Sequence, residues 1–182
     1  MKITDHEVLV APRELHDLVF RCARVAGLDV GAADRVGRNV TFAEVHLGKA
    51  VDCFVSVLND PVRLLSEYDS SPDALVSAEV EAKIIGSVSV VFGVPTPLAA
   101  LVSVIADIEG RGIKVDGVPE DATGATVVER LQVGGPVLPA GLSTRTRAAR
   151  NGLIVTGQTF DVLNVAAKEF LVAESVLDEI ED

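Results

Sequence analysis

Helical spacing of apolar residues dominates the first 65 residues, whereas strand-like sequence is concentrated after residue 84. Between Pro12 and Gly27 the apolar residues recur three and four positions apart, which places them on one face of a helix. Proline suits the first turn of such a helix, and glycine suits its C-terminal cap. Further helices are predicted over 32–45 and 49–58, after a short strand over 7–10.

The rest of the chain alternates turn residues with short apolar runs. The predicted elements, in chain order, are a loop over 68–72 (YDSSP), a β-branched strand over 84–94, a helix from 98 to near 110, short strands over 113–118 and 126–133, a hairpin joining 144–150 to 153–157, and one or two helices from 159 onward. The hairpin rests on Asn151-Gly152, which is typical of a type I′ turn.

Helices first and hairpin-joined strands later, without repeated βαβ units, predict an α+β fold. We expect a helical N-terminal third followed by a mostly antiparallel, hairpin-rich sheet with packing helices. A chain of 182 residues fits one domain. Residues 1–182 are predicted to form one, with a subdomain boundary near 68–72 left open.

The formal net charge of −11 narrows the classes of partner. An acidic chain repels phosphate backbones and anionic lipid surfaces, so neither nucleic acid nor membrane is an expected partner. Apolar stretches all fall short of the ~20 residues that a membrane span needs. Cys22 and Cys53 lie in apolar helical sequence, and the N-terminus does not look like a signal peptide, so a reducing, cytoplasmic setting is predicted.

The histidines do not form a predicted metal site. His6, His16 and His46 lack the i, i+4 spacing that puts two ligands on one helix face, and no CxxC spacing occurs. The glycine-rich fingerprints of nucleotide-binding loops are also missing. The sequence therefore predicts neither a metal nor a cofactor. Acidic pairs such as Glu79 and Glu81 are interpreted as solvated positions.

His46 and Cys53 are the candidate catalytic residues, one as an acid or base and the other as a nucleophile. Seven positions on one continuous helix correspond to about 10.5 Å of rise, which disfavours a direct thiolate–imidazole pair. A structural thiol and a surface or capping histidine are the alternative interpretation.

Arg145, Arg147 and Arg150 form a local basic cluster in this acidic chain and are the candidate ligand-binding residues. On a strand, positions 145 and 147 share one face. Guanidinium groups bind carboxylate or phosphate through two parallel hydrogen bonds, so a small anionic metabolite is the predicted ligand. Alternatively, these arginines balance the acidic tail or keep an edge strand from pairing.

Two stretches, ELHDLVFRCARVAGLDVGAADRVGRNVTFAEVHLGKAVDCF (14–54) and FDVLNVAAKEFLVAESVLD (160–178), resemble the opening and close of an uncharacterised bacterial family, a domain of unknown function. The resemblance implies a shared fold and no activity. The first stretch is also similar to the N-terminal helices of type-2 malate/lactate dehydrogenases. Where that family has a Ser-His-Gly segment with its catalytic histidine, this chain reads Val51-Asp52-Cys53-Phe54, so the dehydrogenase chemistry does not carry over.

Three hypotheses for function follow, of which the third, a purely structural dimer, differs from the first only in lacking a ligand. The first is a non-catalytic module, either an accessory subunit or a small-molecule sensor of a bacterial metabolic pathway, which forms a homodimer or joins a partner subunit. The second is an enzyme acting on a small carboxylate or amide, with Arg145 or Arg147 as the anion clamp and His46 or His16 as the acid or base.

Overall fold

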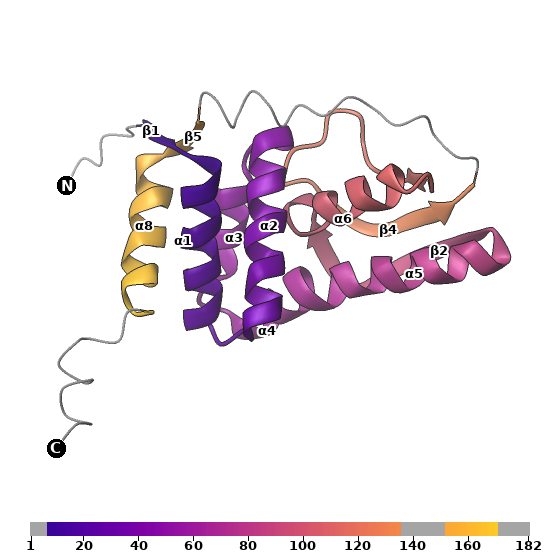
Figure 1. Ribbon diagram of the computed structural model, residues 1–182, viewed down its shortest axis with the longest axis horizontal. Coiled ribbons are helices and arrows are strands. Elements are labelled where there is room, and N and C mark those ends of the chain that lie inside the picture. The colour runs from indigo at the N-terminus through magenta and orange to yellow at the C-terminus, as the bar shows by residue number, and fades with distance from the viewer. Residues whose placement is uncertain (1–6, 136–151, 171–182) are drawn as a thin grey trace, which may run out of the picture.

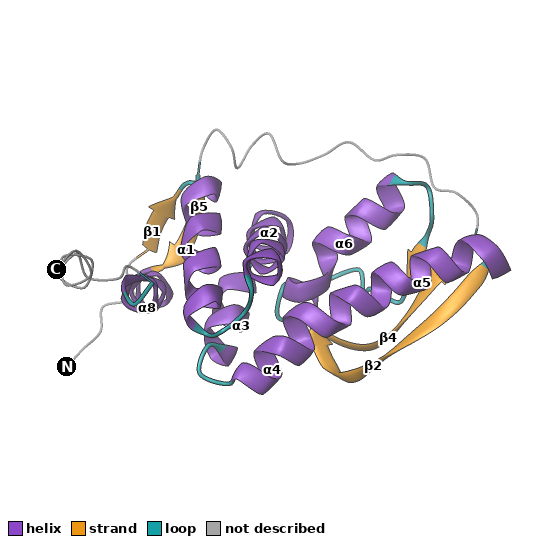
Figure 2. Cartoon of the chain, turned by 60° about the horizontal axis from the view of Figure 1, so that its bottom comes forward, coloured by secondary structure: helices purple, strands orange, loops and turns teal. Residues whose placement is uncertain are grey.

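Four helices pack side by side in the computed structural model, which describes residues 7–135 and 152–170 (Figures 1 and 2). They are α1 (Pro12–Val25), α2 (Val30–Leu47), α3 (Ala50–Val57) and α8 (Gly157–Lys168). The three helices predicted before residue 60 are confirmed. Proline opens α1, and the Asp29 carboxylate caps α2 by accepting a 2.8 Å hydrogen bond from the Ala32 amide.

A single helical rod, residues 61–85, follows α3 in the chain. It consists of α4 (Pro61–Leu65), one turn of π-helix, η1 (Ser66–Ser70), and α5 (Ser71–Ile85). The loop predicted over 68–72 is therefore wrong. Pro72 lies at the start of α5, directly after the π turn. The Ser71 hydroxyl donates to the Ser66 carbonyl oxygen at 3.0 Å, so the serine bonds within the helix instead of ending it.

The strand predicted over 84–94 begins and ends three residues later than predicted. Residues 84 and 85 still belong to α5, and Gly86 ends that helix with a φ of 91°. The strand β2 then runs over Ser87–Pro97. β2 leads into α6 (Leu98–Gly110), which confirms the helix predicted from residue 98.

Two antiparallel sheets complete the fold. β2 pairs with β4 (Val127–Gly134), which also pairs with β3 (Val115–Asp116), and β1 (Glu7–Val10) pairs with β5 (Leu153–Thr156). The α+β class, with helices first and antiparallel strands, is confirmed. The partner predicted for 153–157, the segment 144–150, lies outside the described residues, as does the tail beyond residue 170.

Buried side chains from all of these elements form one core cluster. Asn39 is a buried polar link within it, since its side-chain amide donates a 2.9 Å hydrogen bond from α2 to the Ala100 carbonyl oxygen of α6. Within residues 7–135 and 152–170, every helix is too short or too polar to span a bilayer.

Candidate functional site

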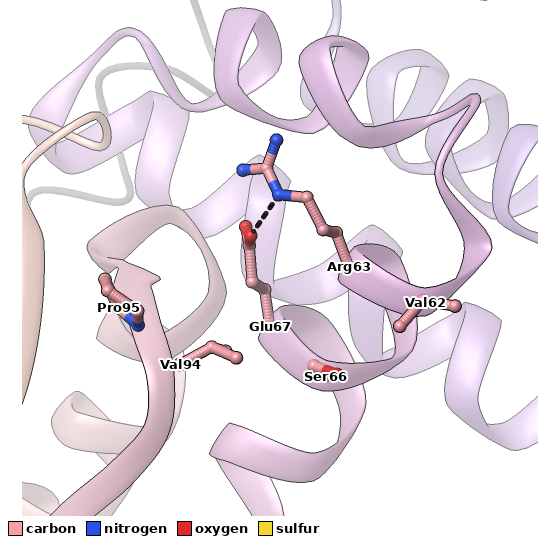
Figure 3. Close-up of a pocket in the computed structure, with 6 residues that line it drawn as sticks. All are labelled: Val62, Arg63, Ser66, Glu67, Val94 and Pro95. Atoms are coloured by element: carbon pink, nitrogen blue, oxygen red, sulfur yellow. Dashed lines mark hydrogen bonds and ion pairs between the residues drawn. The ribbon is translucent and has the colours of Figure 1, made fainter.

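A cleft of about 370 Å³ lies between the rod and strand β2 (Figure 3). That volume is within the range of small-molecule sites, ~300–1,000 Å³. The rod contributes one wall and the irregular part of β2 contributes the other, with Val94 and Pro95 facing the turn that carries Glu67 (Figure 3). The residues that line the cleft are Val62, Arg63, Ser66, Glu67, Val94 and Pro95.

Both walls are local departures from regular structure. The rod contains the π-helical turn, and the register of β2 jumps from Val91 opposite Arg130 to Thr96 opposite Val128. β2 therefore advances five residues while β4 advances two, and the extra residues bend away from the ladder. Single π turns and strand bulges both occur often at functional sites, where they redirect side chains.

Arg63 and Glu67 supply the charge of the cleft. The Arg63 Nε donates a 2.8 Å hydrogen bond to Glu67 Oε1, one turn along the rod. The Glu67 side chain is only 5% exposed, whereas that of Arg63 is 55% exposed. The guanidinium therefore uses its Nε–H on the buried carboxylate, and its two terminal nitrogens are left out of that bond (Figure 3).

Two buried hydroxyls tie the walls together. The Ser71 hydroxyl lies 3.0 Å from the Ser66 carbonyl oxygen and 2.8 Å from the Thr96 hydroxyl. Thr96 in turn lies 2.9 Å from the Val94 carbonyl oxygen. This chain of contacts joins the end of the π turn to the irregular segment of β2, so it holds the two walls at a fixed separation.

Tyr68, next to Glu67 on the π turn, points into the core. Its ring packs edge-on against Phe54 with centroids 5.8 Å apart. Among the described residues its fully buried hydroxyl has no hydrogen-bond partner. Burial, with a smaller contribution from Cys53 and Glu67, raises the pKa of Tyr68 well above its usual value, so the phenol stays neutral.

Replacing Tyr68 with phenylalanine is expected to stabilise the protein by about 1 kcal/mol, because the variant no longer buries an unsatisfied hydroxyl. Chemical denaturation followed by circular dichroism measures the difference. Phe54→Leu is the matched comparison on the other side of the same ring contact, and it should destabilise by about 1 kcal/mol. A loss of stability in Tyr68→Phe would show that the hydroxyl does have a partner.

Cys53 is half-buried on α3. Burial raises the pKa of its thiol, and the carboxylates of Asp52, Glu67 and Glu44 raise it further. The thiolate form, which is the nucleophile, is therefore disfavoured at neutral pH. The other candidate, His46, stacks on Phe42 with ring centroids 4.1 Å apart. These two candidates are not on one helix, since α2 ends at Leu47 and α3 begins at Ala50.

His16 lies between carboxylates at the contact of α1 and α2. Its Nδ1 is 3.6 Å from Asp17 and its Nε2 is 3.4 Å from Asp34. It contacts α2 at Gly37, nine residues before His46, which is about 13 Å along the helix axis. The structure therefore does not bring the two imidazoles together.

The arginine cluster, Arg145, Arg147 and Arg150, lies outside the described residues. Its predicted role as a ligand clamp stays a prediction. Within the described ranges no group of histidine, cysteine and carboxylate side chains is arranged to hold a metal ion.

Two buried glutamates were missed from the sequence. Glu79 was interpreted as solvated, but it is 4% exposed and forms ion pairs with Arg111 and Lys83. Glu67 was not singled out. The i, i+4 spacing of Arg63 and Glu67 is the signal that could have identified the pair at the cleft.

Comparisons of the chain with protein-family models, curated proteins and solved structures found no match. The family resemblances inferred from residues 14–54 and 160–178 accordingly stay predictions.

Proposed function

We propose that this protein is a non-catalytic binding module whose cleft takes a small, mostly apolar molecule that carries a neutral amide group. The observation that supports this proposal is the pairing of a buried Glu67 carboxylate with a half-exposed Arg63 guanidinium, set in a cleft with valine and proline walls.

The ion pair determines the class of ligand. Arg63 alone would attract a carboxylate, but Glu67 already balances its charge at 2.8 Å. A second anion would be repelled by the Glu67 carboxylate. A primary amide meets no such repulsion, because its oxygen accepts from a terminal Arg63 nitrogen and its N–H₂ donates toward the acidic side chain. Val62, Val94 and Pro95 then cover the apolar part of the ligand.

The same lining supports a binding role over catalysis. Among the described residues that line the cleft, none is a histidine, cysteine or lysine, and the Glu67 carboxylate is held in an ion pair by Arg63 at 2.8 Å. General acid–base catalysis needs a group whose pKa lies near the working pH, within ~3 Å of the proton that moves. The candidates His16 and His46 lie on other elements, at the α1–α2 contact and beside Phe42.

We further place the module in the cytoplasm as an accessory or sensor protein. Cys22 and Cys53 are both free thiols. Cys22 is buried, its Sγ donates to the Leu163 carbonyl oxygen, and burial raises its pKa to about 11. Unpaired thiols with a structural role are typical of proteins from reducing compartments.

A titration with cyclohexanecarboxamide tests the proposal, with amide chemical shifts in the ¹H–¹⁵N spectrum as the readout. For a fragment of this size we expect a Kd of roughly 10 mM, at about 0.3 kcal/mol per non-hydrogen atom. The shifts should centre on residues 62–67 and on residues 94 and 96, which flank Pro95. Cyclohexanecarboxylate should bind more weakly, and a carboxylate that binds more tightly would contradict the amide assignment.

Two variants sharpen this titration. Arg63→Gln should weaken amide binding about tenfold through loss of a charged hydrogen-bond donor. Arg38→Gln is the matched control, since Arg38 also forms an exposed i, i+4 ion pair, with Asp34 on α2. Glu67→Gln should reverse the preference in favour of the carboxylate, because it leaves the Arg63 charge unbalanced. Equal weakening by both arginine variants would contradict a specific role for Arg63.

A further inference from the structure

Helix α5 is apolar on two opposite faces. Its inner face buries Leu75, Ala78 and Ala82 in the core. Its outer face carries Val76, Val80 and Ile84, which are 44%, 57% and 79% exposed. Residues four positions apart lie above one another on a helix, so these three side chains form a continuous ridge, here called the outer ridge.

An apolar face on a helix is normally covered by another element, and α5 has two such faces. Among the described residues the outer ridge is uncovered, and α5 lies at the front of the molecule with the sheet and α6 behind and beside it (Figure 2). Three exposed aliphatic side chains in one line differ from scattered surface residues, and such a patch marks an interaction surface.

We infer that the outer ridge binds the outer ridge of a second copy of this chain, with the two α5 helices antiparallel. The spacing supports this partner. In an antiparallel pair whose centre lies level with Ala78, Val76 of each copy is level with Val80 of the other, and Ile84 reaches the first turn of the partner helix. Near-antiparallel helices pack ridges of residues three apart on one helix into grooves between residues four apart on the other, at a crossing angle of about 20°.

Charges at the two ends of α5 fit the same register. Asp73 is exposed in the first turn, and Lys83, which pairs with Glu79 at 2.9 Å and keeps a side chain 54% exposed, is in the last. They are ten residues apart, about 15 Å along the axis. In an antiparallel pair, three residues toward the N-terminus on one helix correspond to three residues toward the C-terminus on the other. The register that pairs Val76 with Val80 therefore also places Asp73 of each copy level with Lys83 of the other. A two-fold axis repeats every contact, so two apolar pairs and two opposite-charge pairs form together.

The dimer does not depend on a ligand in the cleft, and its test is separate. Sedimentation velocity on the full chain at roughly 5–200 μM should show a monomer–dimer equilibrium. Val80→Glu puts a charge at the centre of the ridge and should weaken the dimer more than about 100-fold, because burying an unpaired carboxylate is costly. Val91→Glu is the control, since Val91 is 63% exposed on strand β2 and is not part of the ridge.

A charge exchange tests the register. Asp73→Lys places like charges opposite one another and should raise the dimer Kd about tenfold. Lys83→Asp should do the same relative to Lys83→Gln, the comparison that also loses the Glu79 ion pair but adds no charge. The double variant restores opposite charges and should return the Kd to within about threefold of the original. Circular dichroism checks that each variant is folded. A chain that stays monomeric at the highest concentration, or a Val80→Glu variant that dimerises normally, would overturn the inference, and failure of the double variant to recover would overturn the antiparallel register.

Discussion

Replacing Gly134 with alanine is expected to lower the free energy of unfolding by about 3 kcal/mol or more. Gly134 ends β4 opposite Ser87 and has a φ of 118°, a left-handed conformation that strains any residue with a Cβ atom. A Cβ atom there would also lie 2.4 Å from the Gly86 carbonyl oxygen and 2.6 Å from the Ser87 Cα. Both contacts are with backbone, so relief would require β2 and β4 to separate.

Gly135→Ala separates these two effects. Gly135 has a similar φ of 106°, but a Cβ atom there meets nothing within 4 Å. We therefore expect a loss of about 1 kcal/mol, from backbone strain alone. Urea denaturation followed by circular dichroism measures both variants. Equal losses would show that the close approach of Gly134 to the end of α5 has no energetic weight.

Replacing Glu79 with glutamine is expected to cost about 2 kcal/mol at pH 7 and to change the acid stability of the protein. Arg111 donates two hydrogen bonds of 2.7 Å to the Glu79 carboxylate, and Lys83 adds an ion pair at 2.9 Å. The carboxylate is buried, and its loss would leave the α5–α6 contact without its charged link. Since Arg111 and Lys83 are about half-exposed, solvent screening keeps the cost below that of a fully buried pair.

The pH dependence has a definite sign. The hydrogen bonds from Arg111, aided by Lys83 and opposed by burial, lower the pKa of Glu79 from 4.5 to about 2. A carboxyl whose pKa is lower in the folded state stabilises the fold above its unfolded pKa and loses that contribution as the pH falls. The wild type should therefore lose this stability between about pH 5 and pH 2, and Glu79→Gln should not.

Glu81→Gln is the matched control for this measurement. Glu81 is exposed on the same helix, two residues further on, and has no ion pair with the described residues. Its replacement should change the free energy of unfolding by less than about 0.5 kcal/mol. If Glu79→Gln kept the wild-type pH profile between pH 5 and pH 2, the Arg111–Glu79 pair would not be the source of that acid sensitivity.

The amphipathic elements were predictable from the sequence, and the doubly apolar ones were not. Helix α1 places Leu15, Val19 and Cys22 on one face and charge on the other, so its period is clear. Helix α5 has apolar residues on two opposite faces, so its sequence lacks the contrast between an apolar and a polar face that reveals a helical period. The serines and proline of 68–72 then favoured a loop, although the π turn accommodates them within the rod.

The pairing and the cleft depend on contacts that local sequence does not encode. The strand over 7–10 was predicted, but its partner β5 lies more than 140 residues later. The cleft exists because a π turn meets an irregular stretch of β2, and neither deviation has a sequence signature comparable to a capping residue or a turn dipeptide. The sequence therefore predicted the fold class correctly, and it led to candidate residues, His46 and Cys53, that do not line the cleft.

A crystal structure of the protein soaked with cyclohexanecarboxamide tests the proposed function most directly. The account predicts the ring between Val94, Pro95 and Val62, the amide oxygen within hydrogen-bond distance of a terminal Arg63 nitrogen, and the amide nitrogen turned toward Glu67. A cleft that stays empty while the spectrum in solution still shifts, or an amide bound at another site, would contradict the assignment of this cleft as the binding site.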